Sequence, residues 1–97
     1  MNQSKDVLTD VLIVGKITDV EYLTTVRGDK MAFILVENLL RTVEAVVFPV
    51  AFAKSGDAIR PGEIVAIKGR EEKRSDGTVK IYALEISKQS DPEETEL

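Results

Sequence analysis

Apolar residues gather in five stretches of the chain, and in several of these stretches they alternate with polar residues. A period of two residues is typical of β-strands, and the Val and Ile content of these stretches favours the same structure. The first stretch is too long for one flat strand, and Gly15 inside it indicates a bend or close packing. The strands expected from the pattern cover residues 11–24, 30–37, 42–48, 64–72 and 79–86.

The segments between these stretches carry residues that end strands and form turns. Pro49 closes the third stretch, and Pro61 with Gly62 is a turn signal before the fourth. The sequence SDGT at 75–78 predicts a tight hairpin between the last two strands. Residues 50–59 differ, because Ala, Phe and Lys replace the β-branched residues there. We expect a short helix or a helical turn in that segment.

The resulting order is three strands, a short helix and two strands, which is the order of the oligonucleotide/oligosaccharide-binding (OB) fold. We therefore predict an all-β fold, a small five-stranded Greek-key β-barrel with one short helix between strands 3 and 4. A bend at Gly15 fits this architecture, because the first strand of such a barrel contributes to both of its sides.

Charge divides the chain into a barrel and two tails. Residues 11–88 hold 12 of the 13 Lys and Arg and 11 of the 17 Asp and Glu, a net charge of +1, whereas the two tails carry a net charge of −5. We expect an N-terminal extension at 1–10, one OB-fold barrel at 11–88 and a disordered acidic tail at 89–97. The overall charge of −4 is therefore a poor guide to what the barrel binds.

Absent residue types restrict the chemistry. The chain has no His and no Cys, so it offers no imidazole base, no thiol nucleophile and no common zinc ligand set. Its six Gly are isolated and form no phosphate-binding loop. No apolar run reaches the roughly 18 residues of a membrane span, and the N-terminal segment is too polar for a signal peptide. We expect a cytoplasmic protein that is not an enzyme and uses no cofactor, no metal and no membrane.

Four stretches of the sequence resemble the nucleic-acid-binding domain of the bacterial DNA polymerase III alpha subunit. They are VGKITDV at 14–20, VRGDKMAFILVEN at 26–38, VEAVVFP at 43–49 and IVAIKGRE at 64–71. The chain is also similar, more distantly, to the anticodon-binding barrel of class II aminoacyl-tRNA synthetases. The resemblance covers about residues 11–88, and it implies an OB-fold barrel with single-stranded nucleic acid as the ligand. The segment ENLLR at 37–41 departs from the family pattern, since it is more apolar and lacks a Gly.

The predicted second strand is apolar on both faces, although a half-exposed strand buries only one, and this raises a question about Phe33. In synthetase-like barrels an aromatic residue at this point faces the ligand, and by that resemblance Phe33 faces outward and stacks a base. The other set, Ala32, Ile34 and Val36, then enters the core. In the same synthetase-like barrels a polar side chain near the position of Glu44 reads a base edge, although a carboxylate repels phosphate and accepts only from an amino group. The alternatives are a buried Phe33 and a Glu44 that is simply solvated.

Basic residues of the predicted barrel are candidates for holding phosphates, which they neutralise without reading sequence. Many have acidic neighbours, so an ordinary mixed-charge surface is the alternative. Phe48 and Phe52 are expected to pack, and Tyr22 and Tyr82 either to stack on bases or to cap the barrel with hydroxyls in water. The candidate nucleic-acid-binding residues are Lys16, Arg27, Lys30, Phe33, Glu44, Lys68, Arg70, Lys73, Arg74 and Lys80.

These features predict a non-catalytic protein that binds single-stranded nucleic acid. The first candidate is DNA, in replication, recombination or mobile-element maintenance, and RNA is the other ligand of this class. The alternative function is an OB-fold module for protein–protein interaction or for self-association as a homodimer. The near-neutral barrel, the acidic tail and the apolar pair Leu39 and Leu40 support this alternative.

Overall fold

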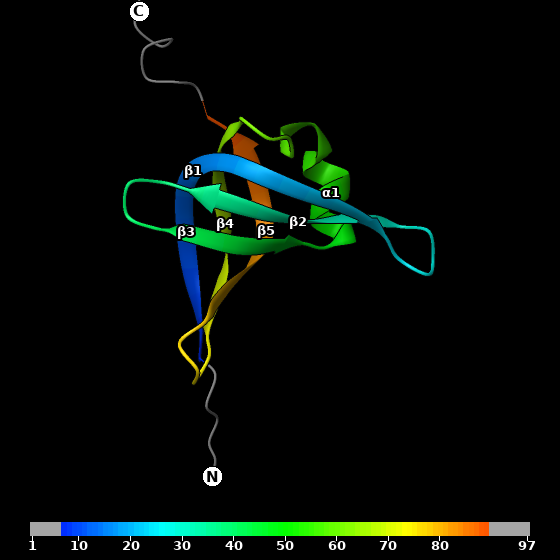
Figure 1. Cartoon of the computed structure of the whole chain (residues 1–97). Helices are drawn as coiled ribbons and strands as arrows, with labels where there is room; N and C mark the ends of the chain where they lie inside the picture. Colours follow the sequence, from blue (N-terminus) through cyan, green and yellow to red (C-terminus); the bar gives the residue numbers. More distant parts are fainter. Residues whose placement is uncertain (1–6, 90–97) are drawn as a thin grey trace, which may run out of the picture.

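A computed structural model describes residues 7–89 of the chain, and it contains the five strands and the short helix that the sequence predicts (Figure 1). The helix lies between the third and fourth strands and continues into a 3-10 turn, η1. The elements are β1 (Val7–Thr24), β2 (Lys30–Glu37), β3 (Thr42–Val47), α1 (Pro49–Ser55), η1 (Gly56–Ala58), β4 (Ile64–Lys73) and β5 (Val79–Lys88).

The strands form a closed barrel in the order β1-β2-β3-β5-β4, and β4 pairs in turn with β1. All neighbouring strands are antiparallel except β3 and β5, which are parallel. β1 closes the barrel because its C-terminal half pairs with β2 and its N-terminal half pairs with β4. This arrangement confirms the predicted five-stranded OB-fold barrel with one helix between strands 3 and 4.

β1 begins at Val7, within the predicted extension at 1–10, rather than at about Val11. Residues 7–10 pair with residues 70–73 at the far end of β4, so β1 and the β4–β5 hairpin project together from the barrel (Figure 1). Thr9 and Asp10 are polar, and this hides the start of the strand from a hydrophobic pattern. Residues 1–6 and the predicted disordered tail beyond Gln89 lie outside the described residues.

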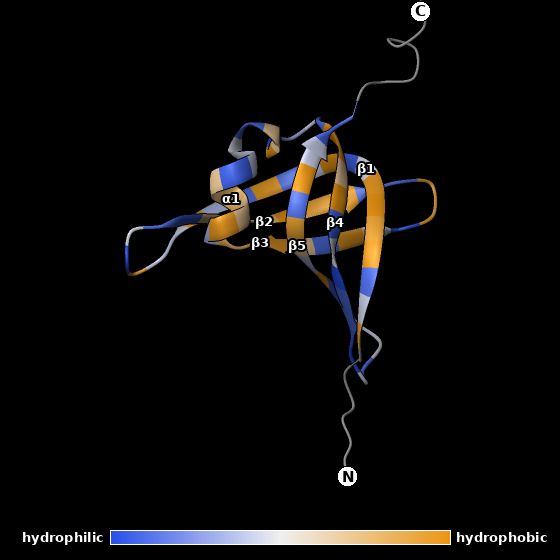
Figure 2. Ribbon diagram, turned by 180° about the vertical axis from the view of Figure 1, so that it is seen from behind, coloured by the Kyte–Doolittle hydropathy of each residue, from blue (hydrophilic) through white to orange (hydrophobic). Residues whose placement is uncertain are grey.

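Side chains along β2 point alternately into the core and toward the outer surface. Ala32, Ile34 and Val36 are 0%, 1% and 1% exposed, as the sequence predicts, while Phe33 lies on the other face. Seen from behind (Figure 2), apolar and polar residues also alternate along β4 and β5. The core consists of Ile13, Ile17, Ala32, Ile34, Val36, Val43, Ala45, Val47, Ala51, Ala58, Ile59, Val65, Ile67, Ile81, Ala83 and Ile86.

Two glycines allow strands to approach closely where the barrel bends. A Cβ at Gly15 would lie 2.7 Å from the Glu37 carbonyl oxygen, so β1 crosses the end of β2 in contact with its backbone. A Cβ at Gly69 would overlap the Tyr82 carbonyl oxygen, where the β4–β5 register shifts between Lys68 and Gly69. The bend in β1 itself coincides with a register shift between Ile17 and Asp19.

Helix length bears on membrane insertion. Among residues 7–89, no helix has the length and apolar content that crossing a bilayer would require.

We expect Gly69→Ala to destabilise the barrel much more than Gly77→Ala. Gly77 has a φ of 92°, but an added Cβ meets nothing within 4 Å, so only backbone strain of about 1–2 kcal/mol is expected. At Gly69 the new methyl would overlap backbone atoms of β5, and a cost of about 3 kcal/mol, the upper end for overpacking, is expected. Urea unfolding of both variants measures the difference, and equal losses would contradict the close approach at Gly69.

Candidate nucleic-acid interface

Register places three large outward side chains side by side across the middle of the sheet. Phe33 of β2 lies opposite Val46 of β3, and Val46 lies beside Tyr82 of β5. Val46 is only 4% exposed although it is not part of the core cluster, because the two rings flank it on the outer surface. The partly buried Phe33 therefore faces outward, as its resemblance to synthetase-like barrels implied.

A fourth side chain extends this row. Phe48 follows β3, is 47% exposed, and stacks on Tyr82 with 6.2 Å between ring centroids and 9° between ring planes. We call Phe33, Val46, Tyr82 and Phe48 the aromatic strip. Phe48 was expected to pack and instead contributes to the surface, whereas Phe52 packs against the core and meets Tyr22 edge to face.

Carboxylates surround the Phe33 end of the aromatic strip. Glu21 of β1 lies directly opposite Phe33, and Leu35 lies between Asp19 of β1 and Glu44 of β3. These residues, with Ile34, line a hollow of about 180 Å³. Glu44 thus points outward beside Phe33, and its other neighbour across the parallel pair is Lys80 of β5.

Basic residues lie at the opposite, Tyr82 end of the strip. Arg70 of β4 is the direct neighbour of Tyr82, and Arg74 begins the β4–β5 turn. The Tyr82 hydroxyl donates a hydrogen bond to Glu72 at 2.7 Å, and Arg74 donates to the same carboxylate oxygen at 3.3 Å. Hydrogen bonds to Tyr82 and then to Glu72 raise the pKa of Arg74, which stays fully charged.

Ion pairs already occupy several of the candidate phosphate-binding residues. Arg70 pairs with Asp10 at 3.5 Å, Arg74 with Glu72 at 3.3 Å and Lys68 with Glu85 at 3.8 Å. Lys80 and Lys73 make no ion pair with any residue in the described range 7–89.

The structure brings together Phe33, Glu44, Lys80, Arg70 and Arg74 along the aromatic strip, with Lys73 next to Arg74 at the end of β4. The remaining four candidates lie elsewhere. Lys16 lies beside Glu37 at the far end of β2, and Arg27 lies in the β1–β2 turn. Lys30 lines a separate hollow with Tyr22 and Phe52.

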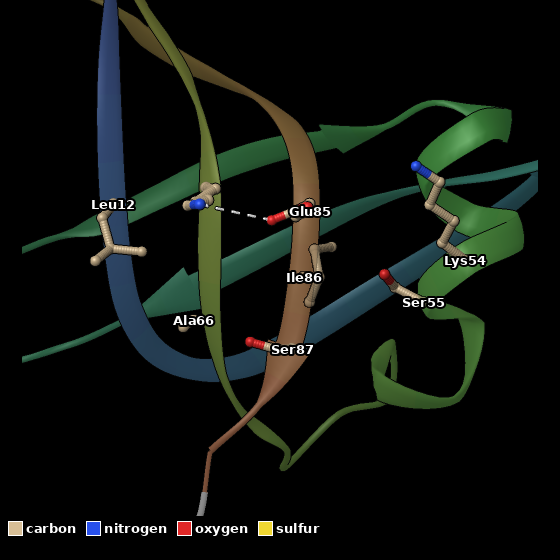
Figure 3. A pocket seen from close by; sticks show the side chains of 8 residues that line it. Leu12, Lys54, Ser55, Ala66, Glu85, Ile86 and Ser87 are labelled. Atoms are coloured by element: carbon tan, nitrogen blue, oxygen red, sulfur yellow. Dashed lines mark ion pairs between the residues drawn. The ribbon is translucent and has the colours of Figure 1, made fainter.

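Lys68, the fourth, lines one hollow together with Arg70 and another hollow over β4 and β5, between β1 and α1 (Figure 3). Leu12 of β1, Ala66 of β4, Ser87 of β5 and Lys54 of α1 also line this hollow, and the dashed line marks the Lys68–Glu85 ion pair. It has no aromatic residue, so it offers no surface on which a base could stack.

The sequence matches the family described as OB-fold nucleic acid binding domain, in the tRNA anticodon group, over residues 11–88. The chain belongs to this family. The description of the family names the same fold and the binding of nucleic acid. The more specific resemblance to the polymerase III alpha subunit stays a prediction.

Among solved structures, the barrel is similar to the mitochondrial single-stranded DNA binding protein of S. cerevisiae. The match has a TM-score of 0.63 and 14% sequence identity, and it covers 87% of this chain and 96% of that chain. At this identity the likeness shows that the two chains share a fold. A search of curated protein sequences found no match.

Sequence reasoning missed two parts of this surface. The pairing of Phe48 with Tyr82 depends on the parallel contact between β3 and β5, which no local pattern reveals. Asp19 and Glu21 were not candidates, although a signal was present. Both are outward-facing positions of a strand that pairs with β2, and they alternate with the partly buried Val20.

We expect the substitution Glu72→Gln to lower the pKa of Tyr82. The hydrogen bond that Tyr82 donates to Glu72, together with desolvation, raises this pKa above its ordinary value of about 10. Tyrosinate absorbance followed against pH in a Tyr22→Phe background measures Tyr82 alone. An unchanged midpoint in the Glu72→Gln variant would show that Glu72 does not hold the hydroxyl.

Proposed function

We propose that this protein is a non-catalytic single-stranded nucleic-acid-binding barrel, with single-stranded DNA as its main ligand. The observation that carries the proposal is the outward-facing aromatic strip on a member of a family described as nucleic acid binding. The resemblance of the VRGDKMAF region to the polymerase III alpha domain supports a role in replication, recombination or mobile-element maintenance.

In this proposal the bases stack on the aromatic strip. Phe33 and Phe48 each present part of a ring to solvent, and the Phe48 ring stacks on the ring of Tyr82. Stacking of a base on an aromatic side chain contributes about 1–3 kcal/mol and accepts any base, because every base has a π-face. Two such platforms suit a short run of unpaired nucleotides.

The sugar–phosphate backbone then follows the basic end of the strip, along β5 and the β4–β5 turn. Lys80 is available, and Arg70, Arg74 and Lys73 lie within the same region. The existing ion pairs are not an obstacle, since exposed pairs contribute only about 0–1 kcal/mol and are easily exchanged for phosphate contacts. Such contacts position the strand without reading its sequence.

Replacement of Phe33 by Leu should weaken binding of labelled oligo-dT and oligo-rU about fivefold or more, the equivalent of about 1 kcal/mol of lost stacking. Leu keeps an apolar side chain at this position, so the fold should be retained, and circular dichroism checks this. Fluorescence anisotropy at low salt measures the affinities. Phe52→Leu, which changes an aromatic residue away from the strip, is the matched control and should leave affinity unchanged.

Basic residues of the proposed backbone path should set the salt dependence of binding. For single strands, the slope of log affinity against log salt is about −0.7 per neutralised phosphate. Lys80→Ala and Arg74→Ala should each reduce that slope by roughly this amount, whereas Lys54→Ala, on α1, should not. If Lys54→Ala changes the slope of log affinity against log salt by as much, the sugar–phosphate backbone lies on another face of the barrel.

A second candidate function is a protein-interaction module, and one observation favours it. Leu39 and Leu40 are 103% and 90% exposed at the tip of the β2–β3 turn. The Asn38 side chain holds this turn by accepting hydrogen bonds from the Leu40 and Arg41 backbone N–H groups. If the protein binds no single strand even at low salt, protein interaction becomes the better-supported function.

A further inference from the structure

The hollow beside Phe33 differs from the rest of the aromatic strip in the charge of its walls. Its polar side chains are all carboxylates, namely Asp19, Glu21 and Glu44. All three are exposed, and none has an ion pair or hydrogen bond with another side chain in the part of the chain that the structure describes. Nor do acidic residues within 7–89 form a group suited to a metal ion. The carboxylates therefore remain available to a ligand.

The direction of a bound nucleotide follows from the order of the strands. The proposed phosphate contacts lie on β5 and β4, and Phe33 lies on β2, two strand spacings or about 10 Å from β5. The Watson–Crick edge of a base points away from its sugar. A base that stacks on Phe33 with its phosphate near Lys80 therefore directs this edge toward β1, where Glu21 and Asp19 lie.

A carboxylate can only accept hydrogen bonds, so it selects a base edge that carries donors. Guanine presents N1–H and N2–H₂ side by side, and these two donors match the two oxygens of one carboxylate. Thymine and uracil present a single N3–H between two carbonyl oxygens, which a carboxylate repels. Adenine and cytosine each offer one amino group next to a ring nitrogen lone pair. Guanine is the base that fits best.

Repulsion between these carboxylates and the phosphates does not prevent this arrangement. On the face that carries Phe33, β3 and β2 lie between β5 and the C-terminal half of β1, which pairs with β2 and not with β4. Salt also screens charges at the surface, with a Debye length of about 8 Å at physiological ionic strength. Glu44 is closer to the phosphate path, but Lys80 lies beside it and offsets its charge.

We infer that the hollow beside Phe33 is a guanine subsite, in which Glu21 and Asp19 of β1 accept hydrogen bonds from the Watson–Crick edge of a base stacked on Phe33. This inference rests on the proposed binding of single strands. The Phe33 ring and the hollow beside it form the subsite, and the carboxylates of Glu21 and Asp19 determine which base the subsite prefers.

The test uses labelled oligo-dT strands that carry one central guanine, inosine or thymine, measured by anisotropy with the full-length protein. Inosine keeps N1–H but lacks the 2-amino group. We expect the guanine strand to bind at least about fivefold more tightly than the thymine strand, the lower bound for a bidentate base contact, with inosine between them.

Three variants assign the preference to β1. Glu21→Ala and Asp19→Ala should each reduce the guanine-to-thymine ratio, even where the loss of negative charge raises the affinity for every strand. The control, Glu37→Ala, removes the same charge from the outer face of β2 without lining the hollow, and its ratio should equal that of the unmodified protein.

Equal binding of all three strands, or a ratio unaffected by Glu21→Ala and Asp19→Ala, would overturn the guanine subsite and leave the proposed single-strand binding intact. No binding of any strand would overturn both. Binding of a hexaarginine peptide is measured as well. Suppose that the peptide binds, that Glu21→Ala abolishes peptide binding, and that the guanine, inosine and thymine strands bind with equal affinity. The hollow then accepts a cationic protein segment, and the inference is wrong.

Discussion

Closure of the barrel by β1 is the constraint on which the rest of the molecule depends. One strand must pair with β2 and with β4, so it has to bend in the middle while keeping its inward residues in the core. The register shift after Ile17 provides the bend, and Gly15 allows the backbone of β1 to pass over the end of β2. Without that contact, β4 and β5 would not close against β2 and β3, and the aromatic strip would lose its support.

Much of the fold could be predicted from the sequence, because its signals are local. Alternation of apolar residues located five strands, and turn residues such as Pro61 and Gly77 separated them. The start of β1 could not be found in this way. Residues 7–10 are held by pairing with the projecting end of β4, so their strand conformation depends on a partner distant in sequence rather than on their own hydrophobicity.

The candidate site was predicted only in part, for a related physical reason. The outward position of Phe33 came from family resemblance and strand alternation. Strand alternation gives no partner for Phe48. Its partner Tyr82 lies on β5, and β5 comes next to β3 only through a parallel pairing of strands that are distant in sequence. The partners of the basic residues could not be predicted either. Lys68 and Arg70 lie on the same face of β4 and line one hollow, yet Lys68 pairs with Glu85 of β5 and Arg70 pairs with Asp10 of β1.

The pairing of Val7 with Lys73 also has a consequence for the order in which the protein folds. β1 is synthesised before the other four strands of the barrel, but half of its hydrogen-bonding partners lie in β4, the fourth strand. Until β4 emerges from the ribosome, the N-terminal half of β1 is an open strand edge that exposes Val11 and Ile13, which pack into the core of the closed barrel. Contacts so distant in sequence make folding slow, and an unpaired apolar edge invites association with other chains in the meantime. The feature that closes the barrel is thus also the point at which a nascent chain is most vulnerable to misfolding.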